Sequence, residues 1–259
     1  MNLLHSNIIG SSGVDLIILH GFLGMGDNWK THAKNLSRIG YKVHLVDQRN
    51  HGKSFWDDSF SYSLMAKDLV NYCNNHYLKK VLVLGHSMGG KTLMHLACEY
   101  PELIKAFIVV DIGPKNYESH HQQILKGLSR LDFDQISTRS EVDKELTKYV
   151  QDSITRQFLL KNLYWKSTER LALRNNINVL KDASELVGVG LNSNAHSFHP
   201  CLFIKGGNSD YILDTDKPII NHHFPNAEHQ LIPLAGHWLH AENPKQFFKI
   251  ISNWLEQQH

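Results

Sequence analysis

The sequence predicts an α/β fold, in which a mostly parallel sheet has helices on both faces and a helical segment is inserted. Three observations support this. Short runs of Val, Ile and Leu alternate with segments of helical periodicity, as is typical of parallel sheets. These runs are apolar throughout, as expected for strands covered on both faces. The alternation stops between Pro114 and Pro200, where the apolar spacing becomes helical.

The strands are predicted from these runs and from turn signals. Residues 3–9 precede the turn signal Ser11-Ser12-Gly13 and should form an antiparallel edge strand. The buried strands are expected at residues 16–19, 43–46, 81–84, 107–110, 202–204 and 230–234. Because helices separate them, these strands should run parallel to one another.

Capping residues and proline place the helices that cover the sheet. Asp27 is expected to cap one helix, and Ser61 or Ser63 the next. Two further helices should cover residues 88–99, which end before a proline, and the residues that follow Pro244. The helix over residues 88–99 matters most, because it begins next to a motif described below.

Residues 114–198 are predicted to form a mostly helical insertion in a core made of residues 1–113 and 199–259. Two apolar stripes have helical spacing: Ile124, Leu125, Leu128 and Leu131, then Val142, Leu146, Tyr149 and Val150. The second stripe should begin at Ser140-Glu141-Val142-Asp143, which is similar to a capping box. The region also contains an alternating patch at residues 171–173.

Composition and charge narrow the class of protein. With 259 residues and 42% hydrophobic residues, the chain can bury a sizeable core. Its 27 Lys+Arg nearly balance 25 Asp+Glu and form no basic run, so nucleic acid is not expected as a partner. The chain has three cysteines, Cys73, Cys98 and Cys201, which lie far apart in the sequence among apolar residues. An odd number of cysteines in such positions indicates reduced thiols and a reducing compartment.

Neither a membrane span nor a metal site is expected. The N-terminus lacks a basic n-region and no apolar stretch approaches about 18 residues, so we expect a cytoplasmic protein with no membrane span. Among the 18 histidines, His120-His121 and His222-His223 are neighbours, which do not face a common metal. No spacing resembles a zinc motif, so the histidines are expected at the surface.

A nucleophile motif follows one of the buried strands. Gly85-His86-Ser87-Met88-Gly89 is a G-x-S-x-G sequence between a predicted strand and a predicted helix. The flanking glycines permit a tight turn, and the start of the helix favours negative charge beside Ser87. Ser87 is therefore the candidate nucleophile, although the same pattern also occurs in turns without a chemical role.

A serine hydroxyl needs a base, and His237 is the candidate. It lies in Ala235-Gly236-His237-Trp238, just after the last predicted strand, and so emerges at the same edge of the sheet as Ser87. His240 is the alternative histidine, and it is expected to have a structural role, such as pairing with Glu242.

Backbone amides for an oxyanion are expected after the first long strand. In His20-Gly21-Phe22-Leu23-Gly24, the flanking glycines leave the N–H of Phe22 free to face a substrate, or less favourably that of Leu23. Together with the N–H of Met88, this amide would form a two-donor oxyanion hole.

These motifs together resemble the α/β-hydrolase superfamily and, within it, the YbfF-type esterases. The segments that carry the resemblance are His20–Gly24, Asp-Gln-Arg-Asn-His-Gly-Lys-Ser at 47–54, Gly-His-Ser-Met-Gly-Gly-Lys at 85–91, Asp111-Ile112-Gly113-Pro114 and Gly236-His237-Trp238. The resemblance implies hydrolysis of short- to medium-chain acyl esters or acyl-CoA thioesters, without a cofactor, and a helical cap in place of the insertion. It also implies that Asp47 and Arg49 brace a wall of the site.

Two aspartates are candidates for the acid that orients His237. Asp111 ends the strand that follows the nucleophile strand, so it should emerge beside Ser87. Asp210 follows the penultimate strand, where many α/β-hydrolases carry their acid, but the superfamily's usual position falls on Ser209. The YbfF-type pattern is similar to Asp111-Ile-x-Pro and leaves position 210 variable. Asp111 is therefore favoured, with Ser209 in a supporting role, and Asp210 is the alternative.

The sequence thus predicts a serine carboxylesterase that acts on a small-molecule ester or thioester. Ser87 would attack the acyl carbon, His237 would take the proton, and Asp111 would hold the imidazole. The oligomeric state is not predicted. Two other readings stay open: carbon–carbon bond hydrolysis or perhydrolysis by the same residues, and a catalytically silent binding protein.

Overall fold

The central element of the protein is one seven-stranded sheet with the order β1-β3-β2-β4-β5-β8-β9. The computed structural model describes residues 2–258. All neighbouring strands of this sheet are parallel except β1, which pairs antiparallel with β3. The predicted α/β class, with its mostly parallel sheet and antiparallel edge strand, is confirmed.

Every predicted strand is present, with one shifted in position. The strands of the sheet are β1 (Ser6–Ile9), β2 (Val14–Leu19), β3 (Tyr41–Val46), β4 (Val81–His86), β5 (Ile104–Val110), β8 (Cys201–Gly206) and β9 (Ala227–Ile232). Strand β9 lies earlier than the expected residues 230–234. It is an edge strand whose exposure largely alternates, so it has no continuous apolar run, and it ends before Pro233, which has no N–H to donate.

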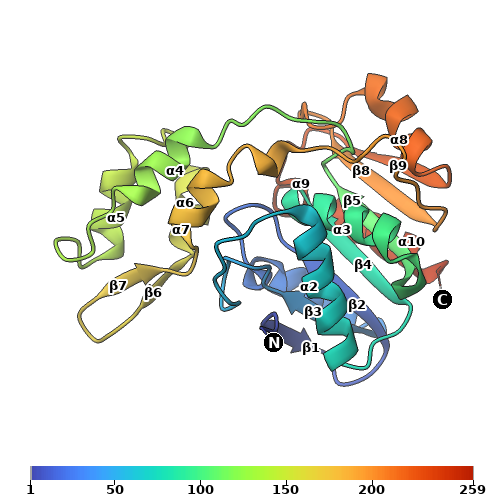
Figure 1. Ribbon diagram of the computed structural model, residues 1–259, viewed down its shortest axis with the longest axis horizontal. Coiled ribbons are helices and arrows are strands. Elements are labelled where there is room, and N and C mark those ends of the chain that lie inside the picture. The colour runs from blue at the N-terminus through green and yellow to red at the C-terminus, as the bar shows by residue number, and fades with distance from the viewer. Residues whose placement is uncertain (1, 259) are drawn as a thin grey trace.

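Different helices cover the two faces of the sheet (Figure 1). One face packs against α2 (Tyr62–Asn75), α3 (Met88–Glu99) and α8 (Lys217–His223), and the other against α1 (Lys30–Ser37) and α10 (Pro244–Glu256). Successive strand residues point to opposite faces: Ile17 and Leu19 belong to the first core cluster, Leu16 and Ile18 to the second. Both faces are therefore apolar, which explains the continuous apolar runs in the sequence.

The start of α2 is as predicted from Ser61. The Ser61 Oγ accepts a hydrogen bond from the backbone N–H of Leu64 at 3.2 Å, which satisfies one free amide of the first turn. Ser63, the other candidate, lies inside the helix, and its hydroxyl donates to Glu99 at 2.7 Å. Of the two serines, Ser61 is the N-cap.

The prediction that Asp27 caps a helix is wrong. Asp27 lies inside a short 3₁₀ helix, Gly26–Trp29, which leads directly into α1. Its carboxylate contacts Lys30 at 2.6 Å and the amide of Asn7 rather than a helix N-terminus. Because the 3₁₀ turn precedes it, α1 begins only at Lys30, later than the sequence pattern indicates. Other short 3₁₀ helices lie at Pro101–Leu103, Leu186–Gly188 and Asp214–Asp216.

The chain between β5 and β8 forms a lobe beside the sheet (Figure 1). It contains α4 (Gln122–Ser129), α5 (Arg139–Leu146), α6 (Ser153–Leu160), α7 (Ile177–Asp182) and a hairpin of β6 (Leu163–Trp165) and β7 (Leu171–Leu173). The hairpin was not predicted, although the alternating patch at 171–173 forms one of its strands. The lobe packs around apolar residues of its own and also against Phe22 and Met88.

The capping box of α5 is formed by Thr138 and not by Ser140. The Thr138 hydroxyl accepts from the Glu141 N–H at 3.2 Å, and the Glu141 carboxylate accepts from the Thr138 N–H at 2.9 Å. A capping box needs a Glu or Gln three residues after the capping residue. Thr138 has Glu141 at that position, whereas Ser140 has the shorter Asp143, and Ser140 therefore lies inside the helix.

A buried lysine joins α3 to both ends of the lobe. The Lys91 side chain is 1% exposed, and its Nζ donates to Lys115 O at 2.5 Å, Val189 O at 2.8 Å and Gly188 O at 3.4 Å. Burial lowers the pKa of Lys91 to about 7, and the nearby Lys115 charge acts in the same direction. One ammonium group thus holds the chain where it leaves the sheet and where it returns.

The prediction that the histidines lie at the surface is wrong for several of them. Among the described residues, the buried histidines are His20, His32, His44, His51, His86, His223 and His240. Most of these rings form a hydrogen bond to the backbone or to a polar side chain, which makes burial of an imidazole tolerable. The cysteines are free, as predicted, and Cys73 and Cys201 are buried.

Candidate active site

Ser87 lies on a strained turn between β4 and α3. Its backbone has φ 52° and ψ −118°, a conformation that a residue with a side chain rarely adopts. A Cβ atom on Gly89 would lie 2.5 Å from Leu19 O, and one on Gly85 would lie 2.4 Å from Gly89 O. The chain can therefore make this turn only with glycine on both sides of the serine.

Asp111 is the aspartate that contacts His237. It follows β5 and is completely buried, and its Oδ2 lies 2.8 Å from His237 Nδ1. The same carboxylate accepts hydrogen bonds from Gly206 N–H at 3.0 Å and from the Ser209 hydroxyl. Asp210 is exposed, and no hydrogen bond or ion pair of the described residues involves its side chain. The geometry therefore favours Asp111 over Asp210.

Several contacts fix the ring of His237. The Tyr211 ring stacks on it with centroids 3.8 Å apart and planes 15° apart. His86 Nε2 donates to the backbone oxygen of His237 at 2.9 Å. With Nδ1–H donated to Asp111, Nε2 of the neutral ring carries the free lone pair. His237 and Ser87 line one cavity, so this lone pair belongs to the same site as the serine hydroxyl.

His240 and Glu242 do not pair with each other. His240 stacks on Trp29, with ring centroids 4.2 Å apart and planes 13° apart, and burial lowers its pKa to about 3. Glu242 instead accepts hydrogen bonds from the backbone N–H of Gly236 at 2.7 Å and of Trp238 at 3.2 Å. The carboxylate therefore shapes the loop that carries His237, whereas His240 packs on Trp29 and lines the cavity.

Of the two amides considered after β2, that of Leu23 is already engaged. The Leu23 N–H donates to His51 Nε2 at 3.2 Å, and His51 Nδ1 donates to Arg49 O at 2.9 Å. Burial lowers the pKa of His51 to about 3, so the ring stays neutral and keeps this acceptor. Within residues 2–258, no hydrogen bond involves the Phe22 N–H, which leaves that amide available.

The Met88 amide is available for a different reason. Met88 is the first residue of α3, and the first N–H groups of a helix have no partner in the helix. They also lie at the positive end of the helix dipole, which favours a negative charge beside Ser87. Phe22 lines the same cavity as Ser87, and Met88 directly follows Ser87 in the chain.

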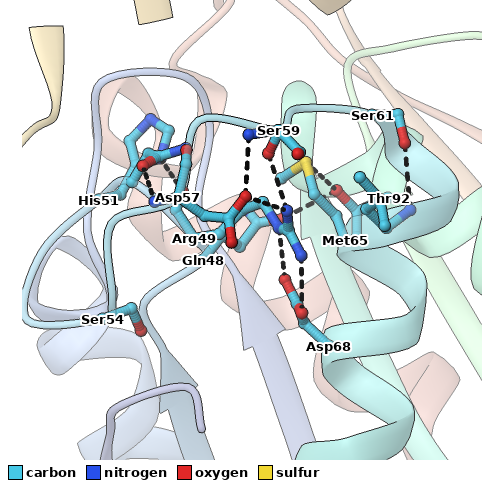
Figure 2. A network of polar contacts seen from close by, with 12 residues as sticks. Gln48, Arg49, His51, Ser54, Asp57, Ser59, Ser61, Met65, Asp68 and Thr92 are labelled. Carbon is cyan, nitrogen blue, oxygen red and sulfur yellow. Dashed lines mark hydrogen bonds and ion pairs between the residues drawn. The ribbon is translucent and has the colours of Figure 1, made fainter. Parts of the chain in front are cut away.

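The loop Asp47–Ser54 is braced by buried polar contacts, some of which Figure 2 shows. Arg49 binds the Asp68 carboxylate through two hydrogen bonds, with Nε at 2.6 Å and Nη2 at 2.9 Å. Burial raises the pKa of Asp68, an effect that the guanidinium opposes. Asp47 accepts from the N–H of Gly26 at 2.7 Å. These contacts fix the position of His51, which in turn holds Leu23.

Two buried histidines near the site were not recognised in the sequence as parts of it. His20 Nε2 accepts a hydrogen bond from the Gln48 N–H at 3.0 Å, and His20 Nδ1 lies 2.8 Å from Gly21 O. Burial lowers the pKa of His20 to about 4. His86 supports His237, and burial lowers its pKa well below the usual value. Both lie at the ends of buried strands beside glycine, which is the signal that could have found them.

The cavity has a volume of about 590 Å³. The insertion contributes apolar side chains to its wall: Ile124, Ile154, Phe158 and Leu159. The core contributes Trp29 and several neutral histidines, and the lining includes no Asp or Glu among the described residues. Lys161 is also in the lining, so such a cavity favours a partly apolar molecule that carries no positive charge.

Two further properties concern the whole described chain. Within it, no three His, Cys, Asp or Glu side chains are grouped so that they could hold a metal ion. No helix in residues 2–258 is both long and apolar enough to cross a membrane.

Comparisons with known proteins agree with the fold. A family model described as "alpha/beta hydrolase fold" matches residues 16–244. "Esterase YbfF" of Escherichia coli is 32% identical over 244 residues, which cover 93% of this chain and 92% of that protein. The "sn-1-specific diacylglycerol lipase ABHD11" of Danio rerio is 34% identical over 251 residues, covering 93% and 78%. A solved structure, "Marine microorganism esterase", superposes with a TM-score of 0.94 at 38% identity, covering 98% and 99%.

Proposed function

This chain belongs to the α/β-hydrolase family, and from that premise we propose that it is a serine carboxylesterase that forms an acyl-enzyme. Its relatives include esterases, which supports hydrolysis of esters by this chain. The observation that carries the proposal is the 2.8 Å contact between His237 Nδ1 and Asp111 Oδ2 in the cavity that contains Ser87. It orients the imidazole so that Nε2 can accept a proton.

In the first step, the Ser87 Oγ attacks the acyl carbon of the ester and its proton passes to His237 Nε2. The imidazole becomes positively charged, and the buried Asp111 carboxylate stabilises that charge through Nδ1. Ser209 and Gly206 hold the carboxylate in place, because each donates a hydrogen bond to it. The carbonyl oxygen becomes negatively charged as the tetrahedral intermediate forms.

The backbone N–H groups of Phe22 and Met88 are proposed to stabilise this oxyanion. Two preorganised donors stabilise charge that develops only in the transition state, which is where stabilisation raises the rate. The hydrogen bond of Leu23 to His51 supports Phe22 rather than Leu23 as the first donor.

The second half of the reaction releases the acid. His237 gives its proton to the leaving alcohol oxygen, the bond between carbon and that oxygen breaks, and the acyl group stays on Ser87. His237 then takes a proton from water, which attacks the acyl carbon, and returns it to Ser87 as the acid leaves. This cycle uses only residues of the chain and water.

The insertion, residues 114–198, is proposed to act as a cap on a core made of residues 1–113 and 199–259. Its apolar side chains in the cavity wall support short- to medium-chain acyl groups as substrates. Acyl-CoA thioesters are included in the proposal, because the same steps cleave a thioester. The free cysteines support a reducing, cytoplasmic compartment.

Covalent labelling tests the proposal directly. A fluorophosphonate should label Ser87 stoichiometrically, as identified by peptide mapping, and Ser87→Ala should not be labelled. Chelators should leave the esterase activity unchanged. Labelling of another serine would overturn the assignment. A substrate panel then separates ester hydrolysis from carbon–carbon hydrolysis and perhydrolysis. It contains butyrate esters, a butyryl thioester, a vinylogous diketone and acetate with peroxide. A protein inert on all of them would be a binding protein.

A further inference from the structure

His121 projects from the insertion into the cavity that contains Ser87 and His237. It is half-buried directly before α4, and its ring packs edge-on against the Phe22 ring with centroids 4.9 Å apart. Within residues 2–258, no hydrogen bond involves either nitrogen of this ring. His121 therefore presents unused polar atoms to the cavity, whereas the other histidines of the lining, apart from His240, each have a ring nitrogen bonded to the protein.

Ring contacts place His121 on the same side of the site as His237. Its ring lies 4.5 Å from that of His120. His120 Nε2 lies 2.6 Å from the Tyr211 hydroxyl, and the Tyr211 ring stacks on His237. Because His237 must give its proton to the leaving oxygen, the alcohol part of an ester lies on this side. His121 is therefore placed to contact the alcohol rather than the acyl chain.

The protonation state of His121 determines what it can bind. Burial lowers the pKa of His121 to about 4, with smaller contributions from the nearby His120 and His237. At neutral pH the ring is uncharged, with one N–H donor and one lone pair. An alkyl chain against this ring would leave both groups unpaired, whereas a hydroxyl can donate to one nitrogen or accept from the other. The cavity lining contains no described Asp or Glu, so it offers no carboxylate to a cationic group.

We propose that His121 is a specificity-determining residue that binds a hydroxyl group on the alcohol part of the ester. The preferred substrates are then esters of polyhydric alcohols, with a free hydroxyl close to the bond that is cleaved. This inference rests on the proposed esterase function and adds to it the chemistry of the leaving group.

A pair of matched esters tests the inference. 2-Hydroxyethyl butyrate and propyl butyrate have the same acyl group and differ only by a hydroxyl in place of a methyl. Wild-type protein should have the higher kcat/KM on the hydroxyethyl ester. In His121→Phe, which keeps the aromatic contact with Phe22 but has no ring nitrogen, the ratio of the two kcat/KM values should fall about three- to tenfold. His121→Asn, which keeps a donor and an acceptor, should restore part of the ratio.

The controls separate this inference from the proposed function. His196→Phe makes the same change at a histidine outside the cavity lining and should keep the wild-type ratio. An unchanged ratio in His121→Phe would overturn the inference while esterase activity persists. Methyl 3-hydroxybutyrate and methyl 3-methylbutyrate form a second pair, in which the hydroxyl is on the acyl part. If His121→Phe changed the ratio of kcat/KM values only for this pair, the inference would also be overturned. If wild type cleaves none of these esters, the proposed function itself is wrong and the inference falls with it.

Discussion

Ser87 and Asp111 occupy equivalent positions at the ends of neighbouring strands, and both have left-handed backbone angles, with φ of 52° and 50°. His86 and Val110, the residues before them, are paired in the parallel register of β4 and β5. The Ser87 N–H donates to Val110 O at 3.0 Å, and the Asp111 N–H donates to Ile204 O at 2.8 Å. The sheet thus fixes both residues through backbone contacts before any side chain contributes.

The choice between the two aspartates leads to the first prediction. Asp111→Asn should lower kcat by about 10⁴, because the amide cannot hold the reactive tautomer or stabilise the imidazolium. Asp210→Asn should change kcat less than about tenfold, since Asp210 is exposed. Steady-state kinetics on one ester measures both variants. If Asp210→Asn lost its activity while Asp111→Asn remained active, the assignment would be reversed.

Ser209 is expected to position Asp111 rather than to react. Ser209→Ala removes one donor from the buried carboxylate, while Gly206 N–H and His237 remain. Loss of one such donor costs roughly 1–3 kcal/mol, so kcat should fall about ten- to a hundredfold with KM nearly unchanged. The pH dependence of kcat should shift in Ser209→Ala, and Ser209→Thr, which keeps a hydroxyl, should recover activity. Equal kinetics in the alanine variant and wild type would contradict this role.

The buried histidines predict a loss of stability in acid. Burial lowers the pKa of His20 to about 4 and those of His51 and His240 to about 3, whereas an unfolded chain titrates histidine near ~6.5. As pH falls below ~6.5, these histidines bind protons in the unfolded state but stay neutral in the folded state. Between ~6.5 and about pH 4, each such histidine should therefore lower the free energy of unfolding by about 1.4 kcal/mol for every unit by which the pH falls. Above pH 7 these groups should add no pH dependence.

Urea denaturation between pH 4.5 and 8 measures this slope. In His240→Phe, which keeps an aromatic ring against Trp29, the slope should be smaller by about one proton. An identical slope in this variant would show that His240 is protonated in the folded protein. The variant should also retain esterase activity, because His240 does not contact Asp111.

Lys91 leads to a prediction about the lobe. Lys91→Met fills the space of the side chain but removes the donor that Lys115 O, Gly188 O and Val189 O share. Lys115 O and Val189 O then lose their donor, while Gly188 O keeps the Tyr117 N–H, so these two segments should open more often. Limited proteolysis should then cut near residues 114–117 and 188–191 faster than in wild type. Cutting at the same rate as in wild type, at equal thermal stability, would contradict a holding role for this lysine.

The sequence predicts most of the sheet because its strands are covered on both faces and are apolar throughout. It misplaces β9, an edge strand with only one neighbour, and it misses the hairpin of β6 and β7, whose strands are three residues each. The burial of histidines such as His51 was also missed, because an imidazole is tolerated in a core only through partners distant in sequence. Sequence motifs predict Ser87 and His237 as site residues, whereas the contact of Asp111 with His237 depends on the pairing of β5 with β8 and of β8 with β9.

The position of Lys91 also has a consequence for how such proteins diversify. Its single ammonium group contacts both Lys115 O and Val189 O, so the two ends of the lobe lie side by side on one helix. A segment that leaves and re-enters a fold at one place is equivalent to a long surface loop, and the entropy of closing such a loop increases only slowly with its length. We therefore expect the lobe to be exchangeable: a shorter, longer or unrelated segment grafted between the same two residues should leave the sheet and Ser87 in place and give the cavity a different wall.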